Sequence, residues 1–177
     1  MTIITAIIAL FLGVVGVAYA AGNIDPAQRH AWGHTIGWVN LSPAHGGATV
    51  YADHLEGDAW AESIGWMRLG THTAGGSHTY ANTTADNYGV NHDANGKLSG
   101  YAWSPVVGWI DFNPTHGQVT IDPATGAFDG YAWSASVGWI HFKGGAGDST
   151  YGVVTTFSEP DEATTFVTFL PLLIKRP

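Results

Sequence analysis

A twelve-residue phrase rich in tryptophan and glycine occurs four times in this chain of 177 residues. Two clear copies read YAWSPVVGWIDF (101–112) and YAWSASVGWIHF (131–142), and two looser copies begin at His30 and Asp58. The eight tryptophans all lie in these copies, as four pairs six positions apart: Trp32/Trp38, Trp60/Trp66, Trp103/Trp109 and Trp133/Trp139. A unit this short cannot bury its own apolar face, so the copies must stack or close on one another.

Each repeat is expected to contain three short strands. Before the last copy, residues 119–122 alternate between apolar and polar, which is the period of a half-buried strand. A turn at 122–126 follows, with proline near its start and glycine at its end. Within the phrase, a short loop at 105–107 places Trp103 opposite Trp109 in a hairpin.

The last strand of each copy has apolar residues at alternate positions, which predicts a face turned to the core. These pairs are Val39/Leu41, Met67/Leu69, Ile110/Phe112 and Ile140/Phe142. The residue between them is polar: Asn40, Arg68, Asp111 or His141. The tryptophans share this polar side, so they lie at the solvated face unless neighbouring units cover them. Repeated tryptophans are often the packing element between units, and the sequence leaves both readings open.

The sequence predicts one all-β domain at residues 30–157, made of four units at about 30–58, 59–100, 101–130 and 131–157. The first unit lacks its leading strand, whereas an unmatched strand, Tyr151–Phe157, follows the last. That strand can complete the first unit. We therefore expect four three-stranded units in a closed or nearly closed propeller- or barrel-like array, which removes exposed edges. An open β-stack is the alternative. The polar insertion at 70–89 is expected to be a surface loop.

The two ends differ in composition from the repeats. Residues 1–21 are apolar without a charged side chain and end in Ala18-Tyr19-Ala20, which is typical of a cleaved signal peptide. A retained, helical membrane anchor is the alternative. Residues 22–29 are expected to be a linker with a turn at Asp25-Pro26. Residues 158–177 are expected to be a linker and a short apolar tail.

The phrase GYAWSxxVGWIxF resembles a repeat that occurs in tandem in exported bacterial proteins. The likeness is close at residues 98–112 and 128–142 and loose at the copies that begin at His30 and Asp58. The C-terminal LPLLIKRP is similar to the tails of secreted proteins from Chloroflexi-type bacteria; a final β-strand is the alternative for this segment. These resemblances imply an exported β-repeat protein, secreted or held at the cell surface, and they carry over no catalytic residues.

Composition and motifs argue against several classes of function. The net charge is −8 with six lysines and arginines, so nucleic acid is not expected as a partner, and membrane contact is expected only through the leader or the tail. No cysteine and no nucleophile or phosphate-binding motif is present, so we predict no enzyme and no cofactor. The nine histidines lack metal-site spacing, and residues 91–96 open like a calcium loop but have Ala102 where its glutamate belongs. We predict no metal.

Three hypotheses remain. The first is a non-enzymatic structural or adhesion protein, outside the cell or on its surface, whose partners are other surface proteins. The second is a glycan-binding module in which aromatic faces stack on the sugar rings of a polysaccharide. The third is a subunit of an extracellular filament in which copies of the chain exchange a strand. The candidate ligand-binding residues for the second are Trp32, Trp60, Trp103, Trp133, Tyr101 and Tyr131.

Overall fold

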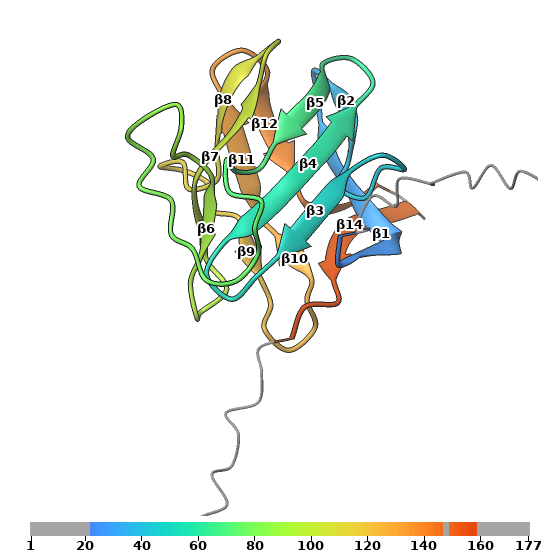
Figure 1. Cartoon of the computed structure of the whole chain (residues 1–177). Coiled ribbons are helices and arrows are strands. Elements are labelled where there is room, and N and C mark those ends of the chain that lie inside the picture. The colour runs from blue at the N-terminus through green and yellow to red at the C-terminus, as the bar shows by residue number, and fades with distance from the viewer. Residues whose placement is uncertain (1–21, 147–148, 159–177) are drawn as a thin grey trace, which may run out of the picture.

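The computed structural model describes residues 22–146 and 149–158, which form an all-β domain (Figure 1). Its barrel strands are β1 (Ile24–Gly33), β2 (Gly37–Asn40), β4 (Leu55–Ala61), β5 (Gly65–Arg68), β7 (Leu98–Ser104), β8 (Gly108–Asp111), β11 (Tyr131–Ser134) and β12 (Gly138–His141). They pair antiparallel in this order, and β12 pairs with β1, so the barrel is closed. The predicted closed all-β array is confirmed, in the form of a barrel.

Most of the predictions for the two ends of the chain concern residues that the structure does not describe. The expected leader at 1–21 and the tail at 159–177 lie outside the described residues. The described part of the chain has no helix that is long and apolar enough to cross a membrane.

Each copy of the tryptophan phrase forms one hairpin of the barrel. In the hairpin of β7 and β8, Trp103 lies opposite Trp109 and Ser104 opposite Gly108, as predicted. The other three hairpins have the same register. Neighbouring hairpins join through equivalent residue pairs: Asn40 with Trp60, Arg68 with Trp103, Asp111 with Trp133, and His141 with Trp32. The barrel therefore has approximate four-fold symmetry, with its hairpin turns at the top of Figure 1.

Small and large side chains alternate inside the barrel. One alanine from the first strand of each hairpin faces inward, and each is at most 2% exposed: Ala31, Ala59, Ala102 and Ala132. The predicted core pairs of the second strands are buried beside them. A space of about 20 Å³ remains among these residues. The interior is therefore a packed core with no room for a ligand larger than water.

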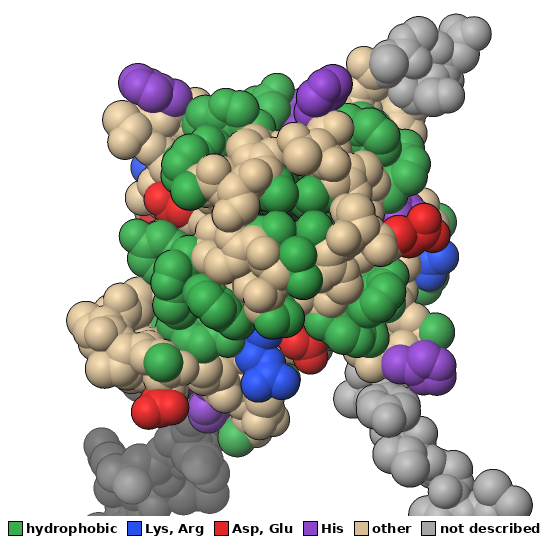
Figure 2. Space-filling view, turned by 90° about the horizontal axis from the view of Figure 1, so that it is seen from above, with side chains coloured by type: hydrophobic (Ala, Val, Ile, Leu, Met, Phe, Trp, Pro, Cys, Tyr) green, Lys and Arg blue, Asp and Glu red, His purple; other side chains and the backbone are tan. Residues whose placement is uncertain are grey.

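Apolar residues in the hairpin turns close one end of the barrel. Ile36, Ile64 and Val107 are buried there, and Val137, at the equivalent position of the fourth hairpin, packs against the same core. Figure 2 looks onto this end and shows hydrophobic side chains at its centre and again around its rim. The core thus continues to one end of the barrel, and further apolar surface lies around the outside.

The predicted third strand of each unit lies outside the barrel. These outer strands are β3 (Gly47–Val50), β6 (Val90–His92), β9 (Thr120–Ile121), β10 (Phe128–Asp129), β13 (Lys143–Ala146) and β14 (Ser149–Thr155). Strand β3 pairs with β4, β6 with β7, and β9 with β10, which leads directly into β11. The first hairpin receives its third strand from the other end of the chain, because β14 pairs with β1. The prediction that the C-terminal strand completes the first unit is confirmed.

The expected linker at residues 22–29 is wrong for most of its length, because β1 begins at Ile24. The expected turn at Asp25-Pro26 is a shift of register between Ile24 and Arg29, within the pairing of β1 with β14. The Asp25 carboxylate accepts a hydrogen bond of 2.8 Å from Ala27 N. Proline has no N–H to give to a sheet, so it is tolerated at such an irregularity.

The insertion at residues 70–89 is a surface loop only in part. Tyr80 and Tyr88 are 2% and 8% exposed, and the Tyr80 hydroxyl donates a 3.0 Å hydrogen bond to Leu55 O. Gly70 and Gly89 pair at the base of the insertion, and a Cβ on either would collide with the Tyr80 ring. The buried Tyr80 therefore fixes the insertion against β4, and Tyr88 packs on Trp109 of β8.

Candidate functional site

All eight tryptophans lie on the outside of the barrel, because they alternate along the strands with inward-facing residues, which are alanine in the first strand of each hairpin and a larger apolar residue in the second. Five are well exposed: Trp38 (51%), Trp66 (39%), Trp109 (44%), Trp133 (39%) and Trp139 (42%). The other three, Trp32, Trp60 and Trp103, are half-buried. Neighbouring units therefore leave much of this aromatic surface in contact with solvent.

The tryptophan pairs also stabilise the hairpins. The rings of Trp103 and Trp109 meet edge to face at 4.6 Å and 63°, and the first two hairpins have pairs at 4.7 and 4.9 Å. Such a pair contributes about 0.5–1.5 kcal/mol beyond the area that it buries. The glycine before the second tryptophan has a positive φ, for example +76° at Gly108, which explains why this position needs glycine.

The six candidate ligand-binding residues do not form one site. Trp32 and Trp60 line a single groove. The other four lie elsewhere on the outer face: Trp103, Trp133, Tyr101 and Tyr131. The Tyr131 ring stacks on His141 at 4.1 Å. Sequence reasoning missed Trp38, the most exposed tryptophan, because the repeat gives no signal for which ring of a pair faces solvent.

The groove has a volume of about 1370 Å³ and follows the seam where the first repeat meets the C-terminal strands. Residues of β1, β2, β13 and β14 line it. We call it the aromatic groove, after its rings Trp32, Trp38, Trp60 and Tyr151. Polar side chains that line it include Gln28, Asn40, Ser63, Asp129 and Lys143. Concave surface, aromatic rings and scattered polar groups are therefore combined at one place on the barrel.

Trp38 is held firmly at the centre of this ring cluster. It meets Trp32 edge to face at 4.7 Å, Tyr151 at 5.3 Å and His30 at 6.0 Å. Burial, helped by the nearby Arg29 charge, lowers the pKa of His30, so this ring is neutral at neutral pH. Burial and the neighbouring Tyr131 raise the pKa of Tyr151, which therefore also stays neutral. The rings of the groove thus offer an uncharged and well-ordered surface.

A single sequence difference explains why the groove lies at this seam. Three repeats have glycine three residues before their first tryptophan, namely Gly57, Gly100 and Gly130, with φ of +86° to +87°. A Cβ there would collide with a carbonyl oxygen of the adjoining segment. The first repeat has Arg29 at this position. Arg29 does not adopt a positive φ, because Asn82 is the one non-glycine residue that does so among the described residues. Because a side chain at this position does not fit the arrangement found at the other three seams, the first seam is built differently. Here β14 pairs with β1 through the shifted register.

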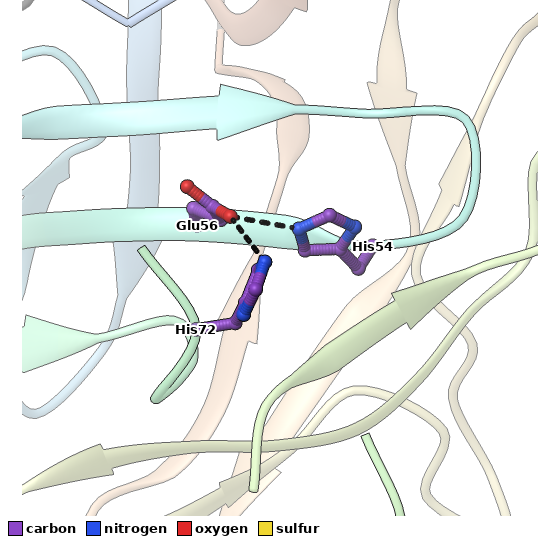
Figure 3. Close-up of side chains that lie close together, drawn as sticks. All are labelled: His54, Glu56 and His72. Carbon is purple, nitrogen blue, oxygen red and sulfur yellow. Dashed lines mark hydrogen bonds and ion pairs between the residues drawn. The ribbon is translucent and has the colours of Figure 1, made fainter. Parts of the chain in front are cut away.

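A second cluster of functional groups lies where the insertion meets β4. His54, Glu56 and His72 point toward one another (Figure 3), and their candidate ligand atoms all lie within 4.8 Å of one another. The Glu56 carboxylate is 3.0 Å from His54 Nε2 and 3.6 Å from His72 Nε2. His54 is fully buried and Glu56 is 6% exposed. We call these three residues the His54 cluster.

Further polar contacts hold the His54 cluster in place. Asp53 Oδ1 lies 2.6 Å from His54 Nδ1, and Glu56 accepts a 2.9 Å hydrogen bond from Gly75 N. His72 Nε2 is 3.1 Å from Gly75 O. Burial alone would raise the pKa of Asp53, but hydrogen bonds from Ser77, His54 and His78 N outweigh it and lower this pKa. Asp53 is therefore an anion at neutral pH that orients the His54 ring.

The sequence shows no metal-site spacing among the histidines, but the fold brings His54 and His72 together around Glu56. The alternation His54-x-Glu56 places two side chains on one face at the start of a strand, a signal that the sequence does contain. His72 could not be added from spacing, since it comes from the insertion. The buried Tyr80, rather than any periodic pattern, fixes the insertion beside β4.

Comparison with family models, with curated proteins and with solved structures gave no match for this chain. The exported-repeat resemblance therefore stays a prediction, and any assignment of function depends on the geometry of the two sites.

Proposed function

We propose that this protein is a non-enzymatic glycan-recognition module, exported to the cell surface or the medium, that binds a neutral oligosaccharide in the aromatic groove. The observation that carries the proposal is the 51% exposure of Trp38 inside a groove that also holds Trp32, Trp60 and Tyr151. Sugar rings present C–H faces that stack on indole and phenol rings, while their hydroxyls need polar partners.

The groove offers both kinds of contact. The Asn40 carboxamide and the Lys143–Asp129 ion pair (3.4 Å) line the same groove and can donate to or accept from sugar hydroxyls. The edge-to-face contacts of Trp38 keep its ring in place before any ligand arrives. Little side-chain entropy is then lost on binding, which favours affinity.

The charge of the protein selects among glycans. At −8, the chain repels acidic polysaccharides at low salt, so a neutral glycan is the expected ligand. A neutral glycan on the surface of another cell, or in the surrounding matrix, would make the module an adhesion protein.

Replacing Trp38 by alanine tests this proposal. Loss of a central aromatic contact costs about 2 kcal/mol, so Trp38→Ala is expected to weaken binding roughly 30-fold. Binding is measured by calorimetry against a panel of neutral oligosaccharides, including β-glucan, xylan, mannan and chitin fragments. Each titration also follows tryptophan emission, which should shift as the rings are covered.

Trp109→Ala is the matched control. Trp109 has the same place in its hairpin, is 44% exposed, and loses an equivalent ring contact with Trp103, but neither residue lines the aromatic groove. Its affinity is expected to equal that of the wild type. Equal affinity of Trp38→Ala and the wild type, or no binding to any neutral glycan, would contradict the proposal and leave a purely structural role.

A further inference from the structure

We propose that His54, Glu56 and His72 bind one divalent transition-metal ion, Zn²⁺ in the first place, which ties the insertion at residues 70–89 to strand β4. This goes beyond glycan recognition and is independent of it, because the residues that line the aromatic groove include none of the three.

The spacing of the three side chains suits a tetrahedral ion. Zinc binds imidazole nitrogen and carboxylate oxygen at about 2.0–2.2 Å, which places neighbouring ligand atoms about 3.4 Å apart. The two distances from Glu56 to the histidines, 3.0 and 3.6 Å, lie on either side of this value. The two histidine ligand atoms lie within 4.8 Å of each other, so an ion can bind between the three atoms after small side-chain movements.

The ligand set also selects the kind of metal. Two imidazoles and one carboxylate suit Zn²⁺ and its transition-metal neighbours, whereas Ca²⁺ and Mg²⁺ prefer oxygen alone. Asp53 Oδ1, 2.6 Å from His54 Nδ1, fixes the ring so that Nε2 is the atom turned toward Glu56. A carboxylate behind a metal-binding histidine is the usual outer partner of such a ligand.

The cluster has a path to solvent. His54 and Glu56 are buried, but the His72 side chain is 25% exposed, and its ring stacks on His78 at 4.1 Å. An ion can thus enter from the side of the insertion. It replaces the contact of His72 Nε2 with Gly75 O, and the fourth position is left for water.

Zinc titration of the whole chain, without a polyhistidine tag, tests the site. In competition with a chromophoric chelator, we expect one equivalent of Zn²⁺ to bind, and Ca²⁺ not to compete. Asp53→Asn is expected to weaken zinc binding about 10–100-fold. His72→Ala, which removes a ligand itself, is expected to weaken it further. His116→Ala, which removes an exposed turn histidine outside the cluster, is expected to leave the affinity unchanged.

Nitrogen NMR of the wild-type imidazoles keeps the test decisive even if a variant does not fold. Zinc is expected to shift the Nε2 signals of His54 and His72 together at one equivalent. Shifts confined to other histidines, a wild type without stoichiometric binding, or a folded His72→Ala with wild-type affinity would each overturn the proposal. None of these results affects glycan binding, which is measured in metal-free buffer.

Discussion

Replacing Phe142 by alanine is expected to lower the free energy of unfolding by about 3–5 kcal/mol, the range for a large-to-small change at a buried aromatic residue. Phe142 is 3% exposed and follows β12 at the end of the barrel opposite the hairpin turns. Its ring lies 5.6 Å from Phe112 and 5.8 Å from Phe128. These two neighbours belong to a barrel hairpin and to an outer strand, so one truncation loosens both layers.

Denaturant unfolding followed by tryptophan fluorescence measures this effect. Val106→Ala serves as the control, since Val106 is 65% exposed at a hairpin tip, and surface changes of this kind usually stay within about 0.5 kcal/mol. A loss below 1 kcal/mol for Phe142→Ala would mean that the barrel core is not packed as described.

The barrel itself could be predicted from the sequence because its information is local and repeated. Alternation at Ile110 and Phe112 indicates the buried face, and the six-residue spacing of Trp103 and Trp109 fixes a hairpin register. Four copies then leave few ways to bury the same face. The unmatched C-terminal strand completes the first unit as β14, whereas the barrel itself closes through the pairing of β12 with β1.

The candidate sites could not be predicted in the same way, because each depends on a departure from the repeat. The aromatic groove lies where Arg29 replaces the glycine of the other units. The effect of this replacement can be seen only once the register of β1 with β14 is known. The His54 cluster needs His72 from a segment with no counterpart in the other repeats. Local patterns define the scaffold, whereas these sites come from contacts distant in sequence.

Replacing Gly130 by alanine is expected to cost about 2–5 kcal/mol of unfolding free energy. The left-handed conformation alone costs about 1–2 kcal/mol for a residue with a side chain, and a steric conflict in a packed region adds about 1–3 kcal/mol. Gly130 has a φ of +87°, and its added Cβ would meet the backbone of Gln118, which cannot move aside as a flexible side chain can.

Gly138→Ala separates the two costs. Gly138 lies in the hairpin that follows Gly130 and has a φ of +77°, but a Cβ there has nothing within 4 Å, so only the conformational cost of about 1–2 kcal/mol is expected. Both variants are compared with the wild type by denaturant unfolding. Equal losses would mean that the backbone of Gln118 does not crowd a side chain at position 130. The presence of Arg29 in place of glycine would then not explain the aromatic groove. A clearly larger loss for Gly130→Ala than for Gly138→Ala would support this explanation.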